Sequence, residues 1–172
     1  MEQSKVQIEL NKFRDYVIKQ ARTNLSKGGK NSSSKLYNSL GGTVKANPNS
    51  FEMEFFMEEY GVFQDAGVSG KKRKYDTPYS YKSKMPPPSK LDKWIVKKGI
   101  APRDKNGKLM NRKSLQFAIA RSIFNNGIKP SLFFTKPFEE GFKRLPEELV
   151  EAYGLDALTI FNEQIDEILT NG

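Results

Sequence analysis

The sequence predicts an α+β fold, and three observations lead to that class. Near the N-terminus, apolar residues recur at three- and four-residue spacing, which is the period of an amphipathic helix. Residues 51–57 largely alternate apolar and acidic side chains, which is the period of a half-buried strand. Helical patterns return near the C-terminus without the alternating βαβ order of a parallel sheet. We therefore expect a single domain over residues 1–172, with an antiparallel sheet packed by an N-terminal amphipathic helix and C-terminal helices, and with a long basic insertion.

The first elements are the most regular part of the pattern. An opening helix ends at Gly28, because glycine readily supplies the left-handed conformation that closes a helix. A short element at 35–40 follows, and residues 43–46 and 51–57 form two strands. The buried stripe of the opening helix is predicted to contain six residues: Val6, Leu10, Phe13, Val17, Ala21 and Leu25.

The second half contains a long segment with neither period. Residues 67–90 hold prolines, glycines and interleaved lysines, and predict a long loop. A short helix begins at Ser89, and residues 131–135 predict a compact apolar strand. Between them a longer helix runs from Ser114 to Asn126, and its predicted inward face consists of Leu115, Ala118, Ile119 and Ile123. Helix returns from Pro137 with a break near Pro146, and a terminal helix is marked by Leu155, Leu158, Ile165 and Leu169.

Positive charge is concentrated in the middle of the chain. The whole sequence carries +9, yet residues 71–113 alone hold 15 basic and 3 acidic side chains. Residues 1–70 are nearly neutral, and residues 114–172 carry a net charge of −4. The sequence thus predicts an ordinary domain with a basic insertion, or arm, over residues 67–113.

Two residue types are missing, which removes most enzyme chemistry. Without cysteine there are no disulfides, thiolate nucleophiles or cysteine zinc sites, and without histidine there are no imidazole bases or histidine metal ligands. A carboxylate site remains as an alternative, built from Glu52, Glu54, Glu58, Glu59 and Asp65, although strand alternation accounts for Glu52 and Glu54 as solvent-facing residues. We expect no catalytic residue, cofactor or metal. The longest apolar run is residues 117–120, so we also expect no membrane span or targeting signal, and synthesis in a cytoplasm.

The insertion carries the residues that are candidates for recognition. A basic run precedes three tyrosines, a composition that suits phosphate contacts and stacking on bases, although it also suits a solvated loop. No nucleic-acid-reading motif accompanies it. A third interpretation is an interaction arm that becomes ordered against a neighbour, with aromatic and apolar anchors. The candidate interface or DNA-channel residues are Lys71, Lys72, Arg73, Lys74, Tyr75, Tyr79, Tyr81, Trp94, Ile95, Lys97 and Lys98.

Four landmarks of the chain follow one another in an order that is found in a known protein family. Residues 35–40, Lys-Leu-Tyr-Asn-Ser-Leu, are similar to the family's Gly-x-Leu-x-x-Ser-Ile segment. Residues 60–67 are similar to its Tyr-Ala-x-x-x-Glu-x-Gly turn, and an insertion with Trp-Ile-Val-Lys-Lys-Gly-Ile at 94–100 follows. Residues 129–138 are similar to the Ala-Arg-Pro-Phe-Leu segment before the closing helix. The order of these landmarks resembles the tail-completion and neck proteins of tailed bacteriophages, and the resemblance covers roughly residues 5–145.

The resemblance implies a structural role without catalysis. Proteins of this kind assemble as rings, commonly six- or twelvefold, that join the phage head to the tail and let DNA pass through the lumen. Portal, neck-ring and tail proteins would be the partners, and the virion the location, after assembly in the host cytoplasm. The alternative from the residues themselves is a basic DNA-binding accessory protein that acts as a monomer or dimer.

Overall fold

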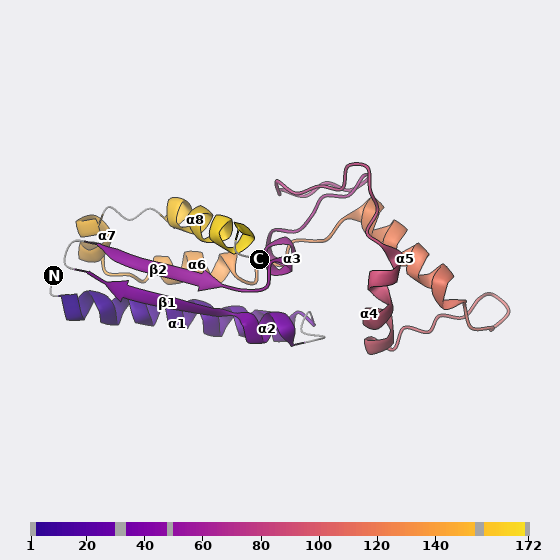
Figure 1. The fold of residues 1–172 in the computed structure, drawn as a ribbon, viewed down its shortest axis with the longest axis horizontal. Coiled ribbons are helices and arrows are strands. Elements are labelled where there is room, and N and C mark those ends of the chain that lie inside the picture. Colours follow the sequence, from indigo (N-terminus) through magenta and orange to yellow (C-terminus); the bar gives the residue numbers. More distant parts are fainter. Residues whose placement is uncertain (1–2, 30–33, 48–49, 154–156, 171–172) are drawn as a thin grey trace. The chain divides into compact units, whose positions relative to one another are not determined.

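The structure is a computed structural model that describes residues 3–29, 34–47, 50–153 and 157–170. Those residues form eight α-helices, one 3-10 helix and a two-stranded antiparallel sheet, which confirms the α+β class. The chain divides into two compact units (Figure 1). We call residues 1–65 with 131–172 the body, and residues 66–130 the inserted unit. The segment predicted as an insertion, 67–113, lies inside the second unit, which extends further to include a long helix.

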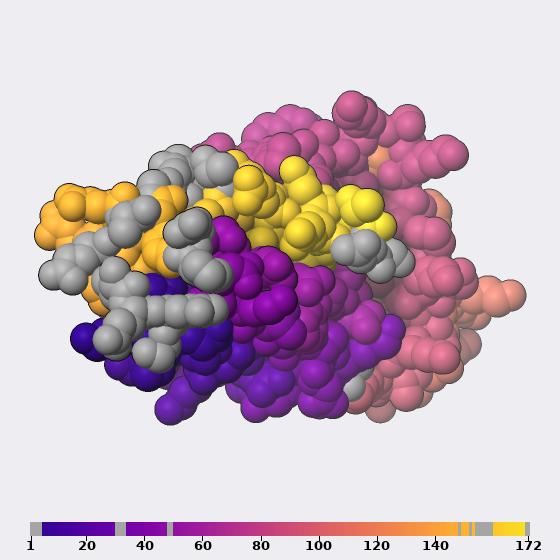
Figure 2. All heavy atoms as spheres, turned by 60° about the vertical axis from the view of Figure 1, so that its left-hand side comes forward, coloured from indigo at the N-terminus to yellow at the C-terminus, as the bar shows by residue number. Residues whose placement is uncertain are grey.

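The body consists of a long helix, a β-hairpin and several shorter helices. Helix α1 runs along β1, and α8 lies along β2 on the other side of the hairpin (Figure 1). Figure 2 shows α1, the hairpin and α8 sharing one face of the body. The elements are α1 (Gln3–Lys27), α2 (Lys35–Ser39), β1 (Gly41–Ala46), β2 (Phe51–Phe56), α3 (Tyr60–Ala66), α6 (Thr135–Phe142), α7 (Glu147–Tyr153) and α8 (Ala157–Thr170), with α3 reaching the first residue of the inserted unit.

The apolar stripe of α1 forms the centre of the body, as predicted. All six of its residues are buried, none more than 4% exposed. Phe13 meets the rings of Phe55 and Phe138 edge to face, at centroid distances of 6.1 and 5.3 Å. Phe134 packs against Phe55 in the same way at 5.4 Å. Edge-to-face geometry is the favourable arrangement for aromatic pairs, so the core joins α1, β2 and α6 through one aromatic cluster.

Glutamine side chains satisfy backbone groups on both outer edges of the hairpin. Gln7 of α1 donates to the carbonyl of Val44 and accepts from the amide of Ala46, at 2.9 and 2.7 Å. Gln164 of α8, itself buried, accepts from the amide of Phe55 at 2.8 Å. An isolated two-stranded hairpin is marginal in water and exposes two unpaired edges. These helix side chains therefore take the place of neighbouring strands.

The inserted unit contains η1 (Pro88–Leu91), α4 (Asp92–Lys97) and α5 (Arg112–Asn126). Asp92, the first residue of α4, joins that helix to α5, because its carboxylate accepts a hydrogen bond from Gln116 at 2.6 Å and lies 3.5 Å from the guanidinium of Arg112. Helix α5 begins at Arg112, two residues before the predicted serine, and the side chain of Asn111 caps it. Its predicted inward face is partly correct: Leu115 is buried and Ile119 is half-buried, whereas Ala118 is exposed.

The predicted strand at 131–135 is wrong. Residues 133–134 form a turn and α6 begins at Thr135, with Phe133 and Phe134 both buried. Leu132 adopts a left-handed conformation, with φ of 52°, which breaks an extended run. A run of three apolar residues fits a buried turn as well as a strand, so periodicity could not distinguish them. Of the predicted terminal helix, Ile165 and Leu169 lie half-buried on α8, whereas Leu155 and the side chain of Leu158 lie outside the described residues.

Asp65 holds the place where the chain leaves the body and returns to it. Its buried carboxylate accepts the amides of Phe134, at 2.7 Å, and Thr135, at 3.2 Å, together with the hydroxyl of Thr135. The first residues of α6 supply no side-chain cap of their own. The backbone carbonyl of Asp65 also accepts the amides of Ser131 and Leu132. One residue before the insertion therefore caps the helix that follows it.

Asp65→Ala tests this cap. The change leaves buried amides of Phe134 and Thr135 without their acceptor, so we expect the free energy of unfolding to fall by about 1–3 kcal/mol. Asp65→Asn keeps one acceptor oxygen and should be destabilised less. Asp15→Ala is the matched control: Asp15 is an exposed α1 carboxylate paired with Arg14, and its removal should change stability by no more than ~0.5 kcal/mol. Urea unfolding measures all three variants, and equal destabilisation of Asp65→Ala and Asp15→Ala would refute the structural role.

Candidate interaction surface of the inserted unit

The eleven candidate residues from the sequence all lie in the inserted unit, and so does most of the positive charge. This unit holds 17 basic and 3 acidic side chains, a net charge of +14. The body holds 12 basic and 17 acidic side chains, a net charge of −5. The boundary between the compact units is therefore also a boundary between opposite charges.

Two glycines let the ends of the inserted unit run close together. Val68 and Ile128 exchange backbone hydrogen bonds at 2.9 and 2.8 Å. A Cβ on Gly70 would lie 2.2 Å from the carbonyl oxygen of Asn125, and one on Gly127 would lie 2.1 Å from that of Val68. Gly127 also has a φ of +73°. Only glycine fits both positions, so the chain is fixed just before the basic run begins.

The backbone of the basic run closes the C-terminal end of α5. The amide of Lys71 donates to the carbonyl of Phe124, and those of Lys72 and Arg73 donate to the carbonyl of Asn125, at 2.8–3.2 Å. All four side chains from Lys71 to Lys74 are exposed. Positive charge near a helix C-terminus is favourable, which gives the run a structural role. The same bonds fix the backbone of the first three residues of this exposed basic run against the end of α5.

Ser69 organises the tyrosine segment that follows. Its buried hydroxyl accepts the amide of Tyr75 at 3.0 Å and donates to the carbonyl of Tyr75 at 3.2 Å. Its backbone accepts from the amide of Tyr81 and donates to the carbonyl of Tyr79, both at 2.9 Å. The chain itself thus orders much of the predicted loop, whereas the sequence favoured a segment ordered by a neighbour.

The three tyrosines are half-buried rather than fully open. The guanidinium of Arg73 lies 5.4 Å from the ring centre of Tyr75, and the ring of Tyr81 lies 6.2 Å from that of Phe124. Burial raises the pKa of the Tyr81 phenol above its ordinary value, because the charged form loses solvation. These contacts occupy parts of the rings that stacking on bases would require.

Trp94 and Ile95 have opposite environments, although both were candidates. Ile95 is 2% exposed and is enclosed by its own chain. Trp94 is 40% exposed and its neighbour Val96 is 54% exposed. Lys97 and Lys98, also exposed, follow Trp94 by three and four residues, the spacing that places side chains on one side of a helix. Helix α4 therefore presents an aromatic residue beside lysines.

The sequence analysis missed part of the exposed apolar surface. Phe117 on α5 is 51% exposed, and Leu109 and Met110 are 57% and 41% exposed. Leu109 and Met110 end a hairpin in which the Asp104 carboxylate accepts the amides of Asn106 and Lys108. The one available signal was the position of Phe117, which does not belong to the predicted inward face of its helix, the face that contains Leu115 and Ile119. Of the eight large apolar side chains that are exposed among the described residues, five belong to the inserted unit.

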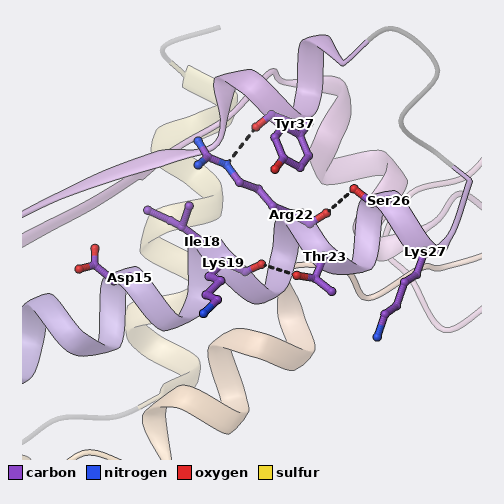
Figure 3. Close-up of a pocket in the computed structure, with 8 residues that line it drawn as sticks. All are labelled: Asp15, Ile18, Lys19, Arg22, Thr23, Ser26, Lys27 and Tyr37. Carbon is purple, nitrogen blue, oxygen red and sulfur yellow. Dashed lines mark hydrogen bonds between the residues drawn. The ribbon is translucent and has the colours of Figure 1, made fainter.

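On the body, a depression beside α1 and α2 is a place to consider for a catalytic site. Lys19, Arg22 and Tyr37 are among the residues that line it, but the Arg22 side chain is hydrogen-bonded to the backbone there (Figure 3). Its guanidinium donates to the carbonyls of Tyr37 and Leu40, at 3.2 and 2.8 Å, and closes the end of α2. Of the candidate carboxylates, Glu58 pairs with Lys35. The part of the chain that the structure describes contains no cluster of three or more His, Cys, Asp or Glu side chains that could hold a metal ion. It also contains no helix that is long and apolar enough to cross a membrane.

Ser69→Ala tests the order of the tyrosine segment. The variant removes the hydroxyl that holds the Tyr75 amide, so we expect that amide to exchange with deuterium roughly two- to tenfold faster. Ser80→Ala is the control, because Ser80 is exposed and pairs with Ser69 through its backbone. Residue-resolved exchange measured by NMR distinguishes them. Unchanged exchange at Tyr75 in Ser69→Ala would show that the hydroxyl does not order this segment.

Comparisons with known proteins give no information on the function of this chain. The chain matches no protein-family model, no curated protein and no solved structure. The features on which a proposal can rest are a basic unit inserted into an acidic body, and exposed apolar side chains concentrated in the inserted unit.

Proposed function

We propose that the protein is a virion structural subunit that assembles into a neck or tail-completion ring between the head and tail of a tailed bacteriophage. The observation that carries this proposal is the separation of charge between the two compact units, +14 against −5. Opposite charges on two parts of one chain let the inserted unit of one copy attract the body of the next. Such a head-to-tail contact closes into a ring when the rotation that relates one copy to the next is a whole fraction of a full turn.

The exposed apolar side chains support assembly as well. Trp94, Val96 and Phe117 stand among lysines and arginines in the inserted unit. Aromatic anchors inside a polar rim are the usual composition of a protein interface. A ring of six or twelve copies around the DNA channel, in contact with portal, other neck-ring and tail proteins, is the arrangement that the family resemblance favours.

One observation favours a second function, a DNA-binding accessory protein. The side chains of residues 71–74 are exposed, and the backbone of Lys71, Lys72 and Arg73 is bonded to the end of α5. Four neighbouring exposed cations suit contacts to a phosphate backbone, without base recognition. In a ring, the same residues would face either the DNA channel or an acidic partner.

Native mass spectrometry of the purified chain tests the ring. We expect a closed oligomer of one copy number at low salt, with a smaller assembled fraction as salt rises, because screening weakens contacts between exposed charges. A chain that stays monomeric over the whole concentration range would contradict the proposal.

A fourfold glutamine variant of residues 71–74 separates the two functions. In the DNA-binding case, affinity for duplex DNA falls, and the slope of log affinity against log salt decreases by about 0.9 for each phosphate that the variant no longer neutralises. In the ring case, the variant still assembles into an oligomer with the same copy number as the wild-type ring. A variant with glutamine at Lys82, Lys84, Lys105 and Lys108, which are also exposed, is the matched control for charge.

A further inference from the structure

A groove on the body lies between the β-hairpin and α8. It has a volume of about 660 Å³, within the range of roughly 300–1,000 Å³ found for protein binding pockets. Residues of β1, β2 and α8 line it, and most of them are polar or charged, with Ile160 of α8 a half-buried apolar residue among them. Both walls come from the body, so the groove is complete within that unit.

The rim of the groove is strongly acidic. Its charged residues are four exposed glutamates, two on β2 and two on α8, against a single lysine, Lys45. Glu163 and Glu167 are one helical turn apart, a spacing at which like charges repel each other. An occupant with positive charge would relieve that repulsion, whereas a nucleic acid would be repelled. The glutamates are Glu52, Glu54, Glu163 and Glu167.

The exposed side of η1 and α4 has the complementary composition. Trp94 is 40% exposed, and Lys90 precedes it by four residues while Lys97 follows it by three. These spacings place both lysines near the Trp94 side of the helical segment, and both are exposed. Two exposed lysines beside an aromatic side chain thus complement in charge a groove that is rimmed by carboxylates.

We propose that Trp94 of one copy docks into the groove between the hairpin and α8 of a second copy, with Lys90 and Lys97 against the glutamate rim. This inference rests on the proposed ring and identifies the contact that builds it. Burial of an aromatic anchor at the centre supplies affinity, and the charged rim supplies orientation and the rate of encounter.

Complementary charge reversal tests the contact. A groove variant carries Glu163→Lys and Glu167→Lys, and a helix variant carries Lys90→Glu and Lys97→Glu. Each variant alone places like charges against each other, so we expect the protein concentration needed for half-assembly to rise by about tenfold or more. Mixed in equal amounts, the two variants restore opposite charges at every contact. The mixture should then form rings in which they alternate.

The controls match these variants in charge and spacing. Glu147→Lys with Glu151→Lys reverses two exposed α7 glutamates that are also four residues apart but do not line the groove. Lys105→Glu with Lys108→Glu reverses two exposed lysines of the hairpin in the inserted unit. Both controls should assemble at nearly the wild-type concentration.

Trp94 also reports directly on docking, because it is the only tryptophan in the sequence. Its fluorescence emission should shift to shorter wavelength as wild-type rings form, and Trp94→Ala should stay monomeric while keeping the far-UV circular dichroism of the folded monomer.

The outcomes separate the two proposals. Rings that persist in both reversal variants would overturn the docking contact and leave the ring itself standing. A wild-type chain without oligomers would overturn both. Failure of the mixture to assemble, with recovery only when all four changes are in one chain, would place the contact within a copy and overturn the docking proposal.

Discussion

The buried carboxylate of Asp65 is the interaction on which the two-unit architecture depends. It lies at the last residue before the insertion and caps α6, which begins after the chain returns. Its backbone carbonyl meanwhile holds Ser131 and Leu132. Exit and return are thus fixed to each other inside the body, so 65 residues can be inserted without disturbing the aromatic core. A carboxylate that serves as a helix cap in this way is a structural group rather than a candidate acid or base.

The same arrangement separates two physical tasks. The body buries two apolar clusters along α1, with α1 and α8 satisfying the edges of its hairpin, and its net charge is negative. The inserted unit uses backbone bonds, Ser69 and Asp92 to order short elements. Two of its three acidic residues, Asp92 and Asp104, are engaged in these structural bonds. Its surface is therefore dominated by cations and exposed apolar side chains, a composition suited to contact with an acidic partner.

The sequence predicted what local periodicity encodes. Six residues of the α1 stripe were assigned correctly because a helical period repeated over five turns is hard to mistake, and the alternation of β2 identified the hairpin. The turn before α6 was missed because the residue that caps it, Asp65, lies about seventy positions away, and no residue near the turn in the sequence indicates this contact. Ser69 orders Tyr79 and Tyr81 through contacts of the same nonlocal kind. Charge counting indicated a basic segment over residues 71–113. It could not tell that Ile95 is enclosed while Trp94 is exposed, since neighbouring residues on a short helix carry no burial signal of their own.

Zero-length cross-linking between isotopically distinct copies is the most direct measurement of head-to-tail assembly. A mixture of ¹⁴N- and ¹⁵N-labelled protein, treated with a carbodiimide, joins lysine to carboxylate only where the two are in contact. The account predicts mixed-isotope links from Lys90, Lys93 or Lys97 to Glu52, Glu54, Glu163 or Glu167. Links confined to single copies, or links between copies that consistently avoid this groove, would contradict it.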